Sequence, residues 1–341
     1  MKRINTLVLF TALLMMASKV VGDEAVVKPH SRGPAASLAG RAQSLPAVPA
    51  GQKRSDNGLS MQLVWCPPGS FLMGSHEPAE AVAEIQGGDD EEYEDEQPQH
   101  RVILTEGFWI GKCEVTQAEW ISVMGTRPWG PDPYASDRPG AAATYIAWHD
   151  AAEFCRRLTA REQRSGRLPA SERYTLPTEA QWEYACRAGT STRWSFGDSD
   201  EDLSDHAWSK TYSLDHEALD LLDLGDNDGE INPSDSHDVG KKLDNAWGLH
   251  DTHGNVCEWC QDWYNKQYYQ KSPGVNPQGP ASGEFRVLRG GAWTYGPAET
   301  RSAARLGTLA GNCSDDIGFR VALVKATQSG TRQSAIKRSN E

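Results

Sequence analysis

Residues 285–323 read FRVLRGGAWTYGPAETRSAARLGTLAGNCSDDIGFRVAL, and this stretch is the most informative part of the chain for the fold. A glycine pair marks a turn just before Trp293. Two arginines follow, Arg301 and Arg305, and an Ile-Gly-Phe-Arg motif ends at Arg320. No cysteine lies between Trp293 and Arg305, which limits the chemistry that this turn can support.

A helix start lies upstream of this stretch. Residues 176–184 read LPTEAQWEY, in which Thr178 and Gln181 have the spacing of a capping box. The pattern predicts a helix that begins after Thr178 and that Gly189 ends, because glycine tolerates the left-handed conformation found after helix C-termini.

Residues 251–258 read DTHGNVCE and place two carboxylates, Asp251 and Glu258, on either side of a glycine turn. Calcium takes six to eight oxygen ligands at about 2.3–2.6 Å and accepts a mixture of carboxylates and backbone carbonyls. The spacing therefore indicates a calcium site. The alternative is a turn in which the two carboxylates cap nearby backbone amides.

Two further helices are expected nearer the N-terminus. Thr116 and Glu119 form another capping box, so one helix should run from residue 117 towards residue 124. A longer helix should begin near Trp148. The apolar residues on or near one face of the longer helix are Ala151, Phe154, Cys155 and Leu158.

Short apolar runs at residues 63–74 and 100–110 have the composition of strands, and a Pro/Gly turn divides the first run in two. Few helices among many short, irregular, Trp- and Gly-rich strands predict an α+β domain with much loop. Disulfides or bound calcium commonly stabilise such loop-rich domains.

Two acidic segments are expected to be solvated loops, because dense like charges repel one another. Seven carboxylates lie within residues 89–96. The second segment, residues 215–240, contains Asp220, Asp223, Asp226, Asp228 and Asp235. A metal trap is the alternative for the first segment. For the second, residues 226–231 resemble the middle of an EF-hand loop, but Leu224 occupies the first ligand position.

The termini suggest export and a tethered domain. Residues 1–22 have the basic start, the short apolar core and the small residues of a signal peptide, so the protein should be periplasmic or extracellular. An uncleaved anchor or a buried helix is the alternative. Residues 23–58 should form a disordered tether, residues 59–325 the domain, and residues 326–341 a disordered tail. No later segment is long and apolar enough to span a membrane.

The net charge of −13 is unevenly distributed. Residues 1–58 carry a charge of +5 and residues 326–341 carry +2, which leaves about −20 on the segment between them. Nucleic acid is therefore not an expected partner, because its phosphates would repel such a domain. All 12 tryptophans lie in the same central segment, which indicates a substantial core.

Taken together, the motifs at 176–184, 251–258 and 285–323 resemble those of the sulfatase-modifying-factor family, which includes the formylglycine-generating enzyme. The resemblance implies a complex C-type-lectin-like fold with large insertions over residues 59–325. It also implies the calcium ligands: the side chains of Asp251 and Glu258 and the backbone carbonyls of Gly254 and Val256. The family's second calcium site has its asparagine near Ala207, which offers no side-chain oxygen.

The resemblance further implies an active site that this chain lacks. In the formylglycine-generating enzyme, two cysteines hold copper and oxygen converts a substrate cysteine to an aldehyde. Those cysteines align with Tyr295 and Thr300, and a nearby serine aligns with Ala292. Monovalent copper requires soft thiolate ligands, which tyrosine and threonine do not provide. Copper is therefore not expected. The candidate binding residues on this segment are Trp293, Tyr295, Thr300, Arg301 and Arg305.

Seven cysteines permit at most three internal disulfides. By the resemblance, Cys155 and Cys186 match disulfide-forming cysteines whose partners fall at Ser302 and Val321, so those two bridges are not expected. Cys313 could pair with another cysteine. Cys257 and Cys260 have the C-x-x-C spacing of redox motifs, although packed, inert thiols are favoured because Glu258 belongs to the expected calcium loop.

Arg301, Arg305 and Arg320 allow two interpretations. They could bind an anionic ligand, or they could pair with Glu179 and Glu183 of the capped helix and hold the C-terminal strands against it. The second is favoured, because buried arginines are usually paired.

Three functions are compatible with these features. The favoured one is an exported binding or accessory member of the family, with a sulfatase or another protein or peptide as client. The alternative is an oxidase that converts a sulfatase cysteine to formylglycine through an altered site. An iron-dependent sulfoxide synthase is disfavoured, because a lone His30 precedes the domain where that class has a histidine-bearing helical domain. The oligomeric state is not predicted.

Overall fold

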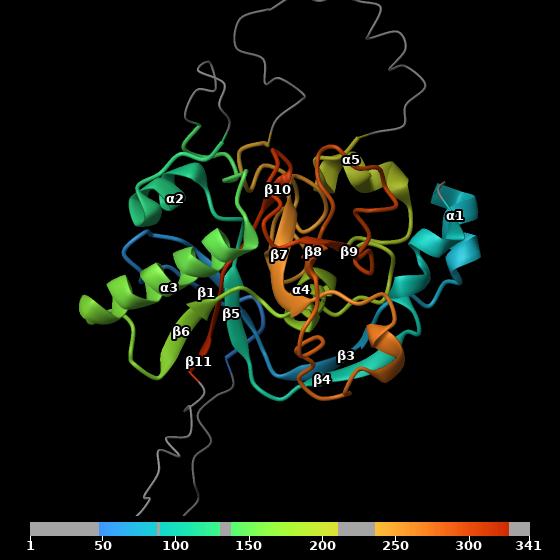
Figure 1. Cartoon of the computed structure of the whole chain (residues 1–341), viewed down its shortest axis with the longest axis horizontal. Helices are drawn as coiled ribbons and strands as arrows, with labels where there is room; N and C mark the ends of the chain where they lie inside the picture. The colour runs from blue at the N-terminus through green and yellow to red at the C-terminus, as the bar shows by residue number, and fades with distance from the viewer. Residues whose placement is uncertain (1–47, 87–88, 130–137, 211–235, 327–341) are drawn as a thin grey trace, which may run out of the picture. The chain divides into compact units, whose positions relative to one another are not determined.

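The computed structural model describes residues 48–86, 89–129, 138–210 and 236–326 (Figure 1). The expected signal peptide, residues 23–47 of the tether, residues 327–341 of the tail and most of the second acidic segment lie outside these ranges. Within them, no helix is long and apolar enough to cross a membrane.

The largest sheet has five antiparallel strands in the order β1-β2-β5-β11-β6. Its strands are β1 (Lys53–Arg54), β2 (Leu63–Cys66), β5 (Phe108–Gly111), β11 (Ala322–Lys325) and β6 (Glu172–Thr175). The C-terminal strand β11 therefore lies between two strands from earlier in the chain, which joins the end of the domain to its beginning.

A second sheet carries the glycine-pair stretch and has the order β10-β7-β8-β9. Its strands are β10 (Ile317–Gly318), β7 (Cys257–Trp263), β8 (Phe285–Arg289) and β9 (Leu306–Leu309). A two-stranded sheet pairs β3 (Gly69–Met73) with β4 (His100–Leu104). The predicted strands at 63–74 and 100–110 are confirmed, and each run supplies two strands that belong to different sheets.

Three helices begin at or next to the predicted residues, at 117, 148 and 179, and two short helices at 79–86 and 203–206 were not predicted. They are α1 (Ala79–Gln86), α2 (Gln117–Met124), α3 (Trp148–Arg164), α4 (Glu179–Arg187) and α5 (Leu203–His206), with 3-10 turns η1 (Asp90–Glu92), η2 (Glu94–Glu96), η3 (Asp200–Asp202) and η4 (Tyr268–Lys271). Both capping boxes are confirmed, at Thr116 and at Thr178. The helix α4 ends with Ala188 and then Gly189 at positive φ.

The predicted apolar face of α3 is confirmed, since all four of its residues are buried. The helix packs beside α2 (Figure 1), and Phe154 stacks on Trp120 with ring centroids 5.7 Å apart. Phe154 also meets Phe319 of the Ile-Gly-Phe-Arg motif. This aromatic group joins the N-terminal helices to the end of the domain.

Two expectations about local order need correction. The tether was expected to reach residue 58, but β1 pairs with β2 and the Gly58 N–H donates to Glu162 Oε2 (3.0 Å). The first acidic segment was expected to be solvated, but it folds into η1 and η2, where Asp95 and Glu96 are buried. Ion pairing with arginines from the far end of the chain offsets the cost of that burial.

The helix α4 carries two buried carboxylates, and each binds an arginine from the glycine-pair stretch. Glu183 Oε2 accepts from Arg289 Nη2 (2.5 Å), and Glu179 accepts from Arg305 Nε (2.6 Å) and Nη2 (3.0 Å). The favoured structural interpretation of Arg305 is thus confirmed. Arg301 instead binds Glu96 through two bonds of 2.6 and 2.8 Å. These pairs attach the C-terminal segment to α4 and η2.

We expect Glu183→Gln to lower the free energy of unfolding by about 3–5 kcal/mol, because it removes the charge that pairs with the buried Arg289 and Arg187 and leaves Arg289 only the more distant Glu179. Urea denaturation measures the change. The matched control is Glu153→Gln on α3, whose carboxylate pairs with the exposed Arg156 and Arg157 and should matter little. Equal urea midpoints for Glu183→Gln and the wild-type protein would contradict the assigned role.

Candidate functional site

The segment after β8 turns back on itself through two glycines. Gly290 and Gly291 have φ angles of +94° and +67°, and a Cβ at Gly291 would lie 2.8 Å from the Glu299 carbonyl oxygen. Both the backbone conformation and this close approach require glycine. The turn brings residues 292–305 over α4 and η2.

The five candidate binding residues lie together on this segment but differ in exposure. Arg301 and Arg305 are buried and bound to carboxylates of the protein itself. Thr300 is also buried, and its hydroxyl donates to the Pro297 carbonyl (3.0 Å) and accepts from an indole N–H. Trp293 and Tyr295 remain partly exposed. Tyr295 and Arg305 line the same cavity.

This cavity, the Tyr295 pocket, has a volume of about 330 Å³. Its walls include three tyrosines and four carboxylates: Tyr93, Tyr264, Tyr295, Glu92, Asp95, Glu96 and Glu299. The residues come from η1, η2, the end of β7 and the segment after the glycine pair. The pocket therefore exists because the acidic segment packs against the C-terminal stretch.

Asp95 is the most unusual group in the Tyr295 pocket. Its Oδ2 accepts a hydrogen bond from the Tyr264 hydroxyl (2.8 Å), and Arg305 Nη1 lies 4.0 Å from the same oxygen. Its Oδ1 is buried and has no hydrogen-bond partner. Burial raises the pKa of Asp95 to about 6, although the nearby Arg305 acts in the opposite direction. Sequence analysis missed this residue, because nothing local distinguishes it from its acidic neighbours.

The two cysteines of the C-x-x-C motif, Cys257 and Cys260, do not lie together beside the Tyr295 pocket. Cys257 packs in the same apolar cluster as Tyr295, whereas Cys260 packs with Trp182 and Cys186 in another cluster. Residues three apart on a strand point to opposite faces, so the C-x-x-C motif on β7 does not present two thiols to one site. Burial raises the pKa of both thiols well above the ordinary value. The expectation of packed thiols is confirmed.

All seven cysteines are free. Cys186 Sγ lies 3.7 Å from Ser302 Oγ, so a hydroxyl faces this thiol where the resemblance implies a cysteine in the animal enzymes. Cys313, which the sequence allowed to pair with another thiol, is exposed and unpaired.

The expected calcium loop follows a strongly bent backbone. Gly254 has φ +85°, and a Cβ there would lie 2.1 Å from the Trp208 carbonyl oxygen, so only glycine fits. Both oxygens of Glu258 accept from Arg320, each at 2.6 Å, and Trp182 Nε1 donates to Oε2 (2.9 Å). Of the expected ligands, Glu258 is therefore already held by hydrogen bonds within the protein.

Asp251 behaves differently from Glu258. Its Oδ2 accepts from the Gly240 N–H (2.6 Å), and a side-chain hydrogen bond with Glu114 opposes the rise that burial causes in the pKa of Asp251. Sequence analysis did not identify Glu114, whose buried Oε1 accepts from Asn255 Nδ2 (3.0 Å). Burial, followed by the charge of Asp251, raises the pKa of Glu114 well above its usual value.

A bound cation would suit this surplus of buried negative charge. Glu114, Asp251 and Glu258 interact with one another and share Arg320 as their cation. The described residues include no group of three or more His, Cys, Asp or Glu side chains arranged to hold a metal. A calcium ion here would need backbone carbonyls among its ligands, as the resemblance implies for Gly254 and Val256.

His253 connects the calcium loop to the segment that forms the Tyr295 pocket. Its Nδ1 lies 2.8 Å from the Thr300 carbonyl oxygen, and its Nε2 accepts from the Ser195 N–H (3.1 Å). Burial lowers its pKa to about 4, so the ring is neutral at pH 7 and donates through Nδ1–H. Sequence analysis did not single out this contact.

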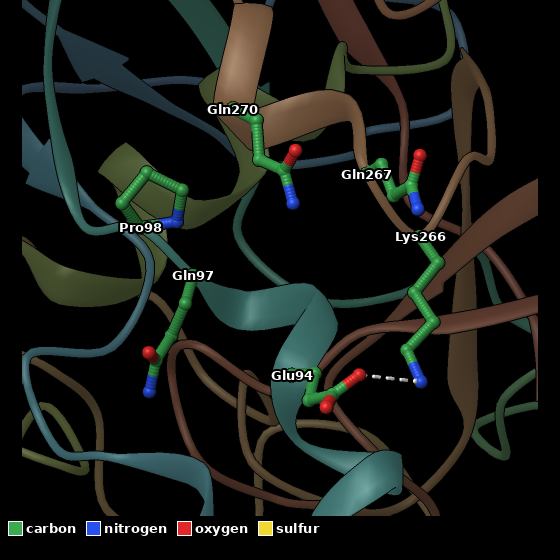
Figure 2. Close-up of a pocket in the computed structure, with 6 residues that line it drawn as sticks. All are labelled: Glu94, Gln97, Pro98, Lys266, Gln267 and Gln270. Atoms are coloured by element: carbon green, nitrogen blue, oxygen red, sulfur yellow. Dashed lines mark ion pairs between the residues drawn. The ribbon is translucent and has the colours of Figure 1, made fainter.

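A second, polar cavity of about 550 Å³ also borders η2 (Figure 2). Figure 2 shows Glu94 of η2 facing Lys266, with Glu94 Oε2 3.0 Å from Lys266 Nζ. The amide side chains of Gln267 and Gln270 project from the opposite wall. The carboxylate of Glu94 is therefore paired with a lysine within this cavity.

Comparison with known proteins identifies the family. Residues 49–325 match the model of the sulfatase-modifying factor enzyme 1-like domain. The formylglycine-generating enzyme of Streptomyces coelicolor is 32% identical over 216 residues, which cover 60% of this chain and 60% of that enzyme. The chain therefore aligns with less than two thirds of that relative's length.

Solved structures share the fold. Treponema denticola variable protein 1 is 25% identical, with a TM-score of 0.61 over 80% of this chain and 98% of that one. PvdO from Pseudomonas aeruginosa is 24% identical, with a TM-score of 0.62 over 81% and 99% of the two chains. Since the family match spans nearly all of the described domain, the chain belongs to the sulfatase-modifying-factor family and has its loop-rich, C-type-lectin-like α+β fold.

Proposed function

We propose that this protein is an exported, calcium-stabilised binding member of its family that receives a peptide segment of a client protein at the Tyr295 pocket. The proposal rests on the resemblance, which places the family's two cysteines at Tyr295 and Thr300, and on the position of Tyr295 in the pocket wall. Thr300 is buried. A sulfatase is the first client to test, because the formylglycine-generating relative belongs to the same family.

Tyr295 suits a binding role better than a catalytic one. An aromatic side chain offers a large contact area and loses little conformational entropy on binding. Burial, together with the nearby Cys257, raises the pKa of Tyr295, so its hydroxyl stays protonated at pH 7 and can donate a hydrogen bond. The altered-oxidase alternative would have to use Cys257, which is a single buried thiol, whereas monovalent copper is best held by a pair.

We expect Tyr295→Ala to weaken binding of a fluorescein-labelled peptide, taken from the cysteine segment of a sulfatase, by about tenfold, or about 1.4 kcal/mol. Fluorescence anisotropy measures the dissociation constant. Leu309→Ala is the control, because Leu309 is exposed on β9 and does not line the pocket.

Thermal melting of both variants separates lost contact from lost folding. Undiminished affinity of a folded Tyr295→Ala variant would place the binding surface elsewhere. If the wild-type protein showed no saturable binding of this peptide, a sulfatase segment would be excluded as client.

Calcium should stabilise the protein through the loop at residues 251–258, because a ligand that binds the folded state stabilises it by about 2.7 kcal/mol at 100 times its dissociation constant. The buried carboxyl groups of Asp251 and Glu114, which lie beside each other and Glu258, support the proposal. The melting temperature is compared in excess calcium and in chelator, for the wild type and for Asp251→Ala. Glu153→Gln is the charge-matched control.

We expect calcium to raise the melting temperature of the wild type and of Glu153→Gln, and to leave that of Asp251→Ala unchanged. If the wild-type protein, first shown to be metal-free, melted at the same temperature in calcium and in chelator, the calcium proposal would be wrong.

A further inference from the structure

Two cavities meet at the edge strand β6, and Tyr295 lines neither of them. The larger, of about 440 Å³, lies between α3 and β6, which pack side by side (Figure 1). The smaller, of about 350 Å³, borders the start of β5 and the end of β11. The residues that line both cavities are Arg173, Thr175 and Gln261. The two cavities therefore abut and form one groove, which we call the β6 groove.

The larger cavity has an apolar wall that is already fixed in place. Trp148 lines it together with Leu176 and the small side chain of Ala152. The indole Nε1 of Trp148 donates to the Cys260 carbonyl (2.8 Å), and the guanidinium of Arg286 lies 3.6 Å from the centroid of the ring. Because the ring is held before a ligand arrives, little entropy is lost when an apolar group packs against it. The volume admits one apolar side chain.

The junction of the two cavities supplies a cation without an acidic partner. Arg173 is exposed and forms no ion pair with any residue that the structure describes. The other charged residues that line the groove are paired, Arg156 with Glu153 and Lys325 with Glu106. The unmatched charge of the β6 groove is therefore positive, although the domain as a whole is acidic.

Hydrogen-bond donors surround that charge. Thr175 Oγ1 lies 3.5 Å from Gln261 Oε1 and donates to it, and the Gln261 Nε2 amide has no hydrogen bond among the described parts of the chain. The junction thus offers the donors of the Arg173 guanidinium and of one amide. A carboxylate fits such donors best, since its two oxygens match the planar guanidinium.

The smaller cavity is lined by neutral polar side chains, which both donate and accept hydrogen bonds. Some of them bond to one another, as Asn276 Nδ2 does to Thr105 Oγ1 (2.7 Å), and this orders the wall. A peptide backbone carries a donor and an acceptor at nearly every residue and can bond to such a wall. The side chains are those of Thr105, Thr175, Thr178, Gln181, Gln261, Asn276 and Gln278.

We propose that the β6 groove binds the C-terminal end of a partner polypeptide whose last residue is apolar. The last side chain enters the larger cavity beside Trp148, the terminal carboxylate pairs with Arg173, and the preceding residues lie along the smaller cavity. A C-terminal residue joins an apolar side chain and a carboxylate to one Cα, which suits two cavities that meet at a cation. This site is separate from the Tyr295 pocket and does not rest on the proposed function.

The test uses three fluorescein-labelled pentapeptides and the purified protein. They are Gly-Gly-Gly-Gly-Leu with a free C-terminal carboxylate, the same peptide as its C-terminal amide, and Gly-Gly-Gly-Gly-Gly with a free carboxylate. Fluorescence anisotropy measures the dissociation constants. We expect the leucine acid to bind about tenfold more tightly than either of the others, because each of those lacks one of the two contacts.

Arg173→Gln should lower the affinity for the leucine acid to that for the amide. The variant should fold, because Arg173 is exposed and has no ion pair to lose. Arg101→Gln is the matched control, since it removes the same charge from an exposed strand residue outside the groove.

Ala152→Leu fills the larger cavity and should weaken binding of the leucine acid to the level of the glycine peptide. Leucine is a good helix former, so α3 should persist. Thermal melting of all three variants checks that they fold.

Equal affinities for the leucine acid and its amide would overturn the inference, as would a preference for the acid that survives Arg173→Gln. Equal affinities for the leucine and glycine acids would also overturn it, because the larger cavity would then take no part in binding. If none of the three peptides bound saturably, a peptide C-terminus would be excluded as the ligand. None of these outcomes bears on the Tyr295 pocket, which is tested with a different peptide.

Discussion

The buried ion pairs between α4 and the C-terminal stretch are the constraint on which the rest of the structure depends. Glu183 holds Arg289 at the end of β8, and Glu179 holds Arg305 after the glycine turn. A buried arginine is tolerated only when its charge and its N–H groups are matched. These pairs therefore fix the path of residues 290–305 over the helix. The Tyr295 pocket lies between that path and η2.

Sequence patterns predicted the structure correctly where it depends on residues that are close together in the chain. Capping boxes at Thr116 and Thr178 and the apolar face of α3 depend on neighbours within a few residues, and all are confirmed. The acidic segment was misjudged because its partners are distant: Arg301 lies 205 residues beyond Glu96. Charge repulsion within the segment was visible in the sequence, whereas the neutralising arginines were visible only in the fold.

The chain has the family fold, and the resemblance places Tyr295 and Thr300 where the formylglycine-generating enzyme has its two cysteines; one fold can carry different functions. The expected calcium loop at residues 251–258 contacts the segment that carries Tyr295 and Thr300. His253 belongs to the expected calcium loop and bonds to the Thr300 carbonyl, beside the pocket. Stabilisation of the loop by a cation would therefore also hold the segment that carries Tyr295. Glu114 and Asp95 could not be recognised from sequence, because the burial of a carboxyl group is a property of the packed structure.

The central claim is that the site at Tyr295 binds a peptide and does not carry out copper-dependent oxidation. The most direct test is titration of the purified protein with monovalent copper, while oxygen consumption is recorded in the presence of a cysteine peptide that carries the sulfatase motif. We predict no stoichiometric copper binding, no oxygen uptake above that of buffer, and a peptide of unchanged mass. Stoichiometric copper binding with conversion of the peptide cysteine to an aldehyde, abolished by Cys257→Ser, would contradict the account.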